Sequence, residues 1–83
     1  MNTLKITQRQ YEELKEIAEG EYTKEVKLRK NLSLYFNASQ RILFVDTPFV
    51  RSEYAGMRVT DSNVFFLDGE GASRGWMTFV IGE

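Results

Sequence analysis

The sequence predicts an α+β fold: a short N-terminal strand and one amphipathic helix, followed by a mostly antiparallel sheet of four to five strands. Two observations carry this prediction. Helix start and stop signals frame residues 8–19, and the strand-like runs that follow are separated by turn residues. An order of helix first and strands afterwards is typical of a sheet packed on one helix. At 83 residues, the chain is expected to form a single domain over residues 1–83.

The helix has the clearest local signals in the chain. Thr7 at the N-cap and Gln10 three residues later match the capping box. Gly20 is placed to end the helix in the left-handed conformation. Apolar residues recur between these signals at helical spacing, so we predict one amphipathic helix over residues 8–19. Its apolar face consists of Tyr11, Leu14, Ile17 and Ala18.

Alternating or apolar runs indicate the strands. Residues 2–6 predict a short strand or an extended lead-in, and alternation around Val26 and Leu28 favours a strand within 21–30. Asp61-Ser62 is expected to join two strands in a tight hairpin. Further strands are expected at 32–36, 41–46, 57–60, 63–67 and 76–81. Hairpin residues 37–40, a long crossing loop over 47–56 and a flexible glycine-rich loop over 68–75 are expected between them.

Three of these runs, 42–45, 64–67 and 76–81, are apolar or nearly so at consecutive positions. An antiparallel sheet with one solvated face normally alternates apolar and polar residues. A helix of twelve residues is only about 18 Å long and shields one face of a sheet. We therefore expect either that the sheet curls into a partial barrel or that its second face meets another chain.

Composition excludes several classes of site. The chain contains no histidine and no cysteine, so Ser-His-Asp, Cys-His and zinc-thiolate arrangements cannot form. Asp68-Gly69-Glu70-Gly71 lacks the ligand spacing of a calcium loop, and no phosphate-binding glycine loop is present. We therefore expect no enzymatic activity, no cofactor and no metal site.

The formal net charge of −1 gives no overall attraction to phosphate backbones or to anionic membranes. The start of the sequence does not resemble a signal peptide, and no apolar stretch reaches the length of a membrane span. The absence of cysteine fits a reducing compartment. We expect a cytoplasmic protein that does not enter a membrane.

Two groups of residues are candidates for contact with a protein partner. Glu12, Glu16 and Glu19 share the helix face opposite the apolar stripe, where they form either an acidic docking strip or an ordinary solvated surface. Trp76, together with Phe49 and the loop residues Tyr54 and Arg74, forms the second group. Trp, Tyr and Arg dominate the binding energy of many interfaces, although burial in the core explains Trp76 equally well.

A basic stretch supports an alternative. Lys24, Lys27, Arg29 and Lys30 lie within seven residues, with aromatic residues at positions 35 and 36. This pattern fits single-stranded nucleic acid, held by phosphate contacts and base stacking. It fits equally an edge strand whose charges prevent sheet-to-sheet aggregation. A second alternative is a small ligand bound at a dimer cleft.

The leading hypothesis from sequence is a small non-enzymatic module that occupies a surface of a larger protein or nucleoprotein complex and self-associates as a homodimer. Inhibition is the natural mechanism for a chain without chemistry of its own. In this general character the chain resembles the small inhibitors that phages direct against host enzymes or defence complexes, which would make it a viral protein. It carries no motif of a named family.

Overall fold

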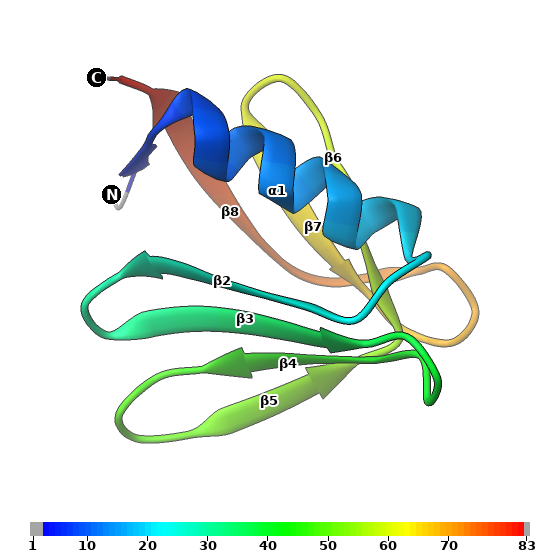
Figure 1. Ribbon diagram of the computed structural model, residues 1–83. Helices are drawn as coiled ribbons and strands as arrows, with labels where there is room; N and C mark the ends of the chain where they lie inside the picture. Colours follow the sequence, from blue (N-terminus) through cyan, green and yellow to red (C-terminus); the bar gives the residue numbers. More distant parts are fainter. Residues whose placement is uncertain (1–2, 83) are drawn as a thin grey trace.

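The computed structural model describes residues 3–82 and confirms the α+β class: a short strand, one helix, then strands. The elements follow in the order β1 (Thr3–Ile6), α1 (Gln8–Glu19), β2 (Lys24–Arg29), β3 (Leu32–Asn37), β4 (Ile42–Asp46), β5 (Arg51–Tyr54), β6 (Gly56–Val59), β7 (Asn63–Leu67) and β8 (Ser73–Ile81). Figure 1 shows α1 above the strands at the top of the molecule.

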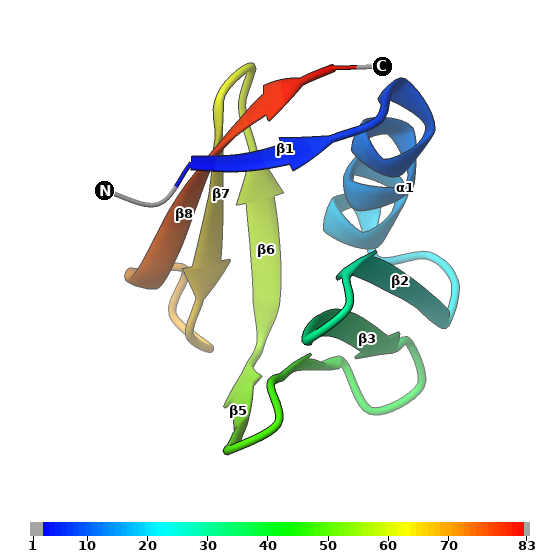
Figure 2. The same cartoon turned by 90° about the vertical axis from the view of Figure 1, so that its left-hand side faces the viewer.

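The eight strands divide into two sheets. Sheet A has the order β1-β8-β7-β6, in which β1 runs parallel to β8, and sheet B is the antiparallel meander β2-β3-β4-β5. The chain passes from one sheet to the other at Ala55, between β5 and β6. Figure 2 shows the two sheets diverging from this point. In this view α1 lies above β2 and faces β6. The sheets do not close into a barrel.

The core lies between the inner faces of the two sheets and α1. Leu14 and Ile17 of α1 are fully buried, and α1 packs on β6 and β2. The strands contribute alternate residues: Leu4, Ile6, Val26, Leu28, Leu34, Phe36, Leu43, Met57, Val64, Phe66 and Phe79. No polar side chain is buried in the described part of the chain. Apolar packing therefore holds the two sheets and the helix together.

The helix begins and ends where its sequence signals predict. Thr7 Oγ1 accepts the amide of Gln10 at 3.0 Å, and Gln10 Oε1 accepts the amide of Thr7 at 2.9 Å, so both bonds of the capping box are present. Gln10 Nε2 also donates to the carbonyl of Lys27 at 3.0 Å, which ties the start of the helix to β2. Gly20 ends the helix at φ 74°, in the left-handed region.

Three details of the predicted strands were wrong. The strands after the helix form two sheets rather than one, because β5 and β6 do not pair and the chain changes sheet between them at Ala55. The expected crossing loop 47–56 contains β5, which places Tyr54 in a strand. Strand β8 begins at Ser73 rather than at 76, so Arg74 also lies in a strand. Position 2 of the expected first strand lies outside the described residues.

The apolar runs are explained by packing on one face only. In β4, β7 and β8, alternate residues such as Leu43, Val64 and Phe79 enter the core. The residues between them, among them Phe44, Phe65 and Trp76, point outward and stay half-buried or exposed. Sheet B, rather than the helix alone, covers the inner face of sheet A. The outer faces of both sheets keep apolar surface.

Candidate protein-interaction surfaces

The outer face of sheet A carries a row of three side chains, Arg58, Phe65 and Trp76, which we call the outer row. Arg58 of β6 lies opposite Phe65 of β7, and Phe65 lies opposite Trp76 of β8. The Arg58 guanidinium carbon sits 4.6 Å from the centre of the Phe65 ring. Neighbouring side chains on one sheet face contact each other directly, so these three residues form one surface.

Trp76 lies at the end of this row and is 61% exposed, so it is not buried in the core. Val80 lies farther along the same face of β8 and is 52% exposed. A guanidinium beside two aromatic rings is the composition of an interface centre. The positions of Arg58 and Phe65 were missed from sequence. The Asp61-Ser62 turn could have revealed them, because it fixes which residues of the hairpin face each other.

Tyr54 of β5 and Arg74 of β8 lie near each other, beside the β7–β8 loop. They line an open pocket of about 390 Å³ between sheet B and the β7–β8 loop, together with Arg41, Ile42, Glu53, Ala55, Asp68 and Gly69. The Tyr54 ring is half-buried and stacks on Phe66, with centroids 5.1 Å apart. Tyr54 therefore contributes to packing between the sheets, whereas the Arg74 side chain is 65% exposed.

Gly75 makes room for this stacking. A Cβ at Gly75 would lie 3.3 Å from the Tyr54 hydroxyl oxygen and 3.5 Å from a carbon of the Phe66 ring. The missing side chain thus lets the tyrosine of sheet B lie against the backbone of sheet A.

Asp68 orders the β7–β8 loop that precedes Arg74. Its Oδ1 accepts the amides of Ala72 and Glu70, each at 2.9 Å, and its Oδ2 accepts Arg74 Nε at 2.8 Å. The Ala72 amide, the Arg74 side chain and the Glu70 amide, in that order, lower the pKa of Asp68 because they stabilise the ionised carboxylate. Two backbone bonds, from the Asp68 amide to the Ala72 carbonyl and from the Gly71 amide to the Asp68 carbonyl, complete the hydrogen bonding of this loop.

The acidic helix face and the basic stretch meet at one point. Lys24 Nζ lies 3.1 Å from Glu16 Oε1, and both residues line a pocket of about 320 Å³ together with Glu19, Tyr22 and Thr23. Glu12 is also exposed but accepts only a bond from Gln8, at 3.4 Å. This ion pair offsets one charge in each predicted patch.

The four predicted basic residues are distributed along one strand. Lys24 starts β2, whereas Arg29 ends it and Lys30 follows in the turn, roughly 20 Å away at strand spacing. Lys27 lies between them on the outer face. Of the two aromatic residues expected to stack on bases, Phe36 is buried in the core. Only Tyr35 faces outward, on the same side of the sheet as Lys27.

The outer face of sheet B has an aromatic pair between two carboxylates. Tyr35 stacks on Phe44 at 6.1 Å between ring centres, and the cross-strand row runs Glu25, Tyr35, Phe44, Glu53. A base that stacked here would bring its phosphates near both glutamates. The Arg51 guanidinium carbon also lies 4.6 Å from the centre of the Phe44 ring, so charges of both signs flank the aromatic pair.

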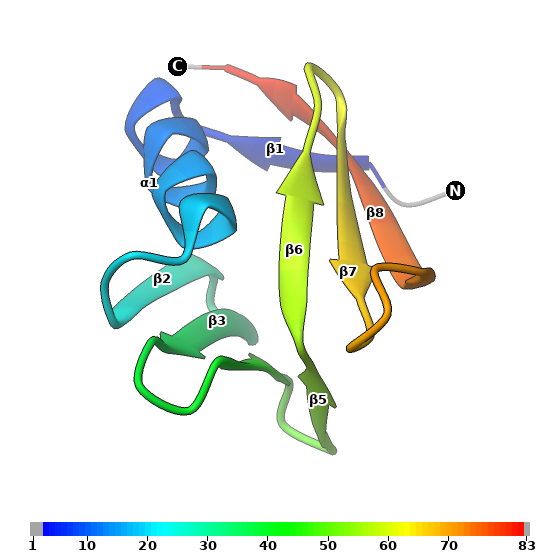
Figure 3. The same ribbon diagram turned by 90° about the vertical axis from the view of Figure 1, so that its right-hand side faces the viewer.

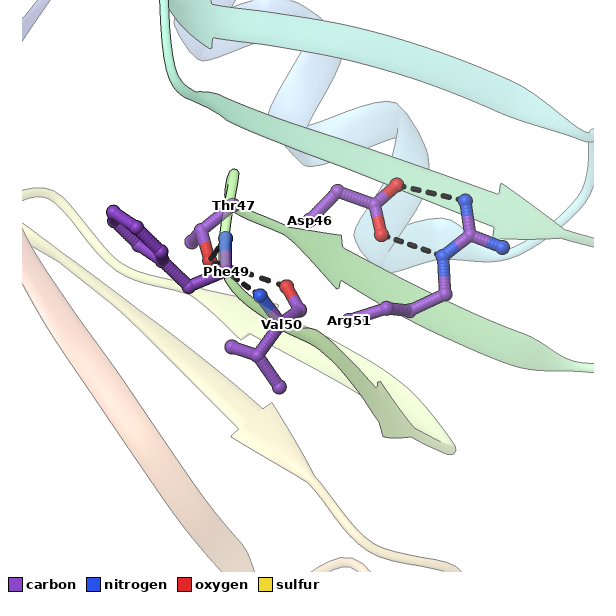
Figure 4. A network of polar contacts seen from close by, with 5 residues as sticks. All are labelled: Asp46, Thr47, Phe49, Val50 and Arg51. Carbon is purple, nitrogen blue, oxygen red and sulfur yellow. Dashed lines mark hydrogen bonds and ion pairs between the residues drawn. The ribbon is translucent and has the colours of Figure 1, made fainter.

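The β4–β5 turn presents the most exposed aromatic residue. Thr47 Oγ1 accepts the amides of Phe49 and Val50 at 3.3 and 3.2 Å, while its own amide donates to the Val50 carbonyl at 2.9 Å (Figure 4). Below the turn, Arg51 Nε lies 2.6 Å from Asp46 Oδ1, and this hydrogen bond raises the pKa of Arg51. Phe49 is 94% exposed on this braced turn.

Within residues 3–82, no helix has the length and apolar character that a membrane crossing requires. The same residues contain no group of three acidic side chains placed to hold a metal ion. No protein-family model, curated protein or solved structure matches the chain.

Proposed function

We propose that the protein is a non-enzymatic interaction module that binds a protein partner through the outer row of sheet A. The observation that carries the proposal is Trp76, 61% exposed beside Phe65 on a rigid strand rather than on a loop. Leaving an indole in water forgoes the free energy of its burial, and a partner that covers it recovers that energy. Strand pairing fixes the ring in place, so binding costs little conformational entropy.

A protein partner fits this surface better than a nucleic acid does. Trp76 and Phe65 have one cation beside them, Arg58, and that guanidinium already lies on the Phe65 ring. Nucleic-acid affinity depends on several phosphate contacts, whereas Arg58 and Lys5 lie on the two opposite edge strands of this sheet. The remaining predicted basic residues, Lys27, Arg29 and Lys30, lie on the other sheet.

The mode of action that we propose is occupancy. The module covers a surface of a larger protein or nucleoprotein complex in the cytoplasm and inhibits it by excluding that complex's own ligand. The small size and mixed surface charge support this role, as they do for the phage inhibitors whose general character the chain shares. The pocket of about 390 Å³ supports a second possibility, a small ligand bound there, because Arg41, Tyr54 and Arg74 all line it.

The test is to capture partners from the native cell with the wild-type chain and with Trp76→Ser, and then to measure binding of each purified partner. We expect Trp76→Ser to weaken binding by tenfold or more, about 1.4 kcal/mol, as for an interface anchor. Tyr22→Ser is the matched control, because Tyr22 is 76% exposed but lies on the α1–β2 loop. A partner that binds wild type and Trp76→Ser equally well would contradict the proposal.

Fluorescence gives an independent readout, because Trp76 is the chain's single tryptophan. We expect its emission to shift to shorter wavelength, and its quenching by iodide to fall, when a purified partner is added. Emission that stays unchanged at saturating partner would place the interface away from the outer row.

A further inference from the structure

We propose that two copies of this chain pair edge to edge through β5, in antiparallel orientation, with a two-fold axis at Ser52. Strand β5 is the last strand of sheet B and pairs with β4 on one side only. Figures 1 and 3 both show it at the lower border of the molecule, with no described segment beyond it. Such an edge can extend its sheet by adding another strand.

The hydrogen bonds of the β4–β5 hairpin determine which backbone groups of β5 face the free edge. The Thr47 amide donates to the Val50 carbonyl, which makes these two residues a hydrogen-bonded pair at the end of the β4–β5 ladder. Hydrogen-bonded and non-hydrogen-bonded pairs alternate along an antiparallel ladder. Arg51, opposite Asp46, and Glu53 therefore belong to non-hydrogen-bonded pairs. Their N–H and C=O groups point away from β4, toward the free edge.

The sequence Val50 to Tyr54 is self-complementary about Ser52. In an antiparallel pair centred there, Arg51 lies opposite Glu53 of the second copy, and Val50 lies opposite Tyr54 of the second copy. Arg51 and Glu53 are both exposed on the outer face, so opposite charges meet. They are also the residues whose backbone groups face the edge, so each such pair exchanges two backbone hydrogen bonds.

Neighbouring registers lack this match. An axis at Arg51 would place two guanidiniums opposite each other, and an axis at Glu53 would place two carboxylates opposite each other. Like charges directly opposite on a sheet are destabilising. The charges of β5 thus select a single symmetric register.

Arg51 is able to bind Asp46 of its own chain and Glu53 of the second copy at the same time. Its bonds to Asp46, Nε to Oδ1 and Nη2 to Oδ2, use two of the five N–H donors of the guanidinium. The guanidinium carbon also lies 4.6 Å from the centre of the Phe44 ring, which holds the charge on the outer face. The other donors remain for Glu53 of the second copy. Because the edge has only four residues, we expect concentration-dependent association rather than an obligate dimer.

The first test exchanges the charges and measures molar mass by sedimentation equilibrium over a concentration series. Arg51→Glu alone and Glu53→Arg alone each place like charges opposite each other, and we expect each to weaken self-association by about tenfold or more. An equimolar mixture of the two variants restores both opposite-charge pairs and should form a heterodimer. Glu25→Arg is the control, since Glu25 is exposed like Glu53 but lies on β2, the opposite edge strand of the same sheet.

The second test uses the absence of cysteine. In this register Ser52 lies opposite Ser52 of the second copy in a non-hydrogen-bonded pair, where the Cα atoms are about 4.5 Å apart. That distance allows a disulfide. We expect Ser52→Cys to form a covalent dimer in air, whereas Ser62→Cys, on the exposed β6–β7 turn, stays reduced or dimerises far more slowly.

A wild-type chain that remains monomeric at millimolar concentration would overturn the proposal. A dimer that tolerates Arg51→Glu, or a mixture of the two variants that stays monomeric, would do the same. Circular dichroism of each variant shows whether it is folded, and the mixing and disulfide experiments do not depend on Arg51→Glu alone. All of these measurements use the purified chain, so their outcome is independent of the partner proposed for the outer row.

Discussion

Trp76 and Phe79 lie on the same strand and face opposite ways, and their replacement tests which face of β8 is inside. Phe79 is 1% exposed, and its ring centre lies 5.6 Å from that of Tyr11. Burial of an aromatic ring removes roughly 150–250 Å² from water, worth about 4–6 kcal/mol at about 25 cal/mol per Å². We therefore expect Phe79→Ala to lower the free energy of unfolding by about 4 kcal/mol, within the usual range for such truncations.

Trp76 is 61% exposed, so only about two fifths of its surface is covered by the protein. The covered part that alanine would lose is roughly 80 Å², which corresponds to at most about 2 kcal/mol because extended-chain areas are upper limits. Trp76→Ala should accordingly destabilise the fold by no more than half as much as Phe79→Ala, although it removes the larger side chain.

The assay is thermal and urea unfolding of both variants, followed by circular dichroism. For 83 residues, 1 kcal/mol corresponds to about 6 °C in Tm, so Phe79→Ala should melt about 24 °C lower and Trp76→Ala at most about 12 °C lower. If Trp76→Ala proves as destabilising as Phe79→Ala, the inward face of β8 has been misassigned. The outer row would then not be available to a partner.

Three further predictions concern local hydrogen bonds. Thr7→Ala removes the bond from the Gln10 amide and should cost about 1 kcal/mol, or about 6 °C in Tm; an unchanged Tm would show that the capping box contributes nothing. Because the pKa of Asp68 is lowered in the folded state, the stability it contributes is present at neutral pH and is lost as the pH falls below about 4. Asp68→Asn should therefore melt below wild type at neutral pH and together with it near pH 2; a gap that persists in acid would argue against the ionic origin. Thr47→Val removes the acceptor of the Phe49 and Val50 amides, so hydrogen exchange should accelerate at these two amides while those of α1 stay protected. Equal exchange in both proteins would mean that the turn is ordered by other contacts.

The parts of the fold predicted from sequence are those encoded locally. Thr7, Gln10 and Gly20 specify the helix within fourteen consecutive positions, and each forms the predicted contact or conformation. Strand β5 was missed because Arg51–Tyr54 contains a single apolar residue, and pairing with β4 rather than composition makes it a strand. The division into two sheets depends on the break between β5 and β6, and the parallel pair of β1 and β8 joins residues far apart in the sequence; no local pattern indicates either feature.

The candidate site was predictable in part, for the same reason. Residue type alone singled out Trp76, and the structure places it on an exposed strand face. Its neighbours Arg58 and Phe65 depend on strand register, which residue type does not reveal. The contact between Glu16 and Lys24 depends on how the chain folds back after Gly20, so two patches that look independent in the sequence are joined in the structure.

The parallel pairing of β1 with β8 has a consequence for the order of events on the ribosome. Thr3 is synthesised 75 residues before its neighbour Thr78. The meander of sheet B consists of adjacent hairpins, and all its strands have been made once Tyr54 is synthesised. Strand β1, with Leu4 and Ile6, has no strand to pair with until β8 follows. Of the described strands, the first to be made is thus the last to be paired, which makes this parallel contact the natural slow step of folding.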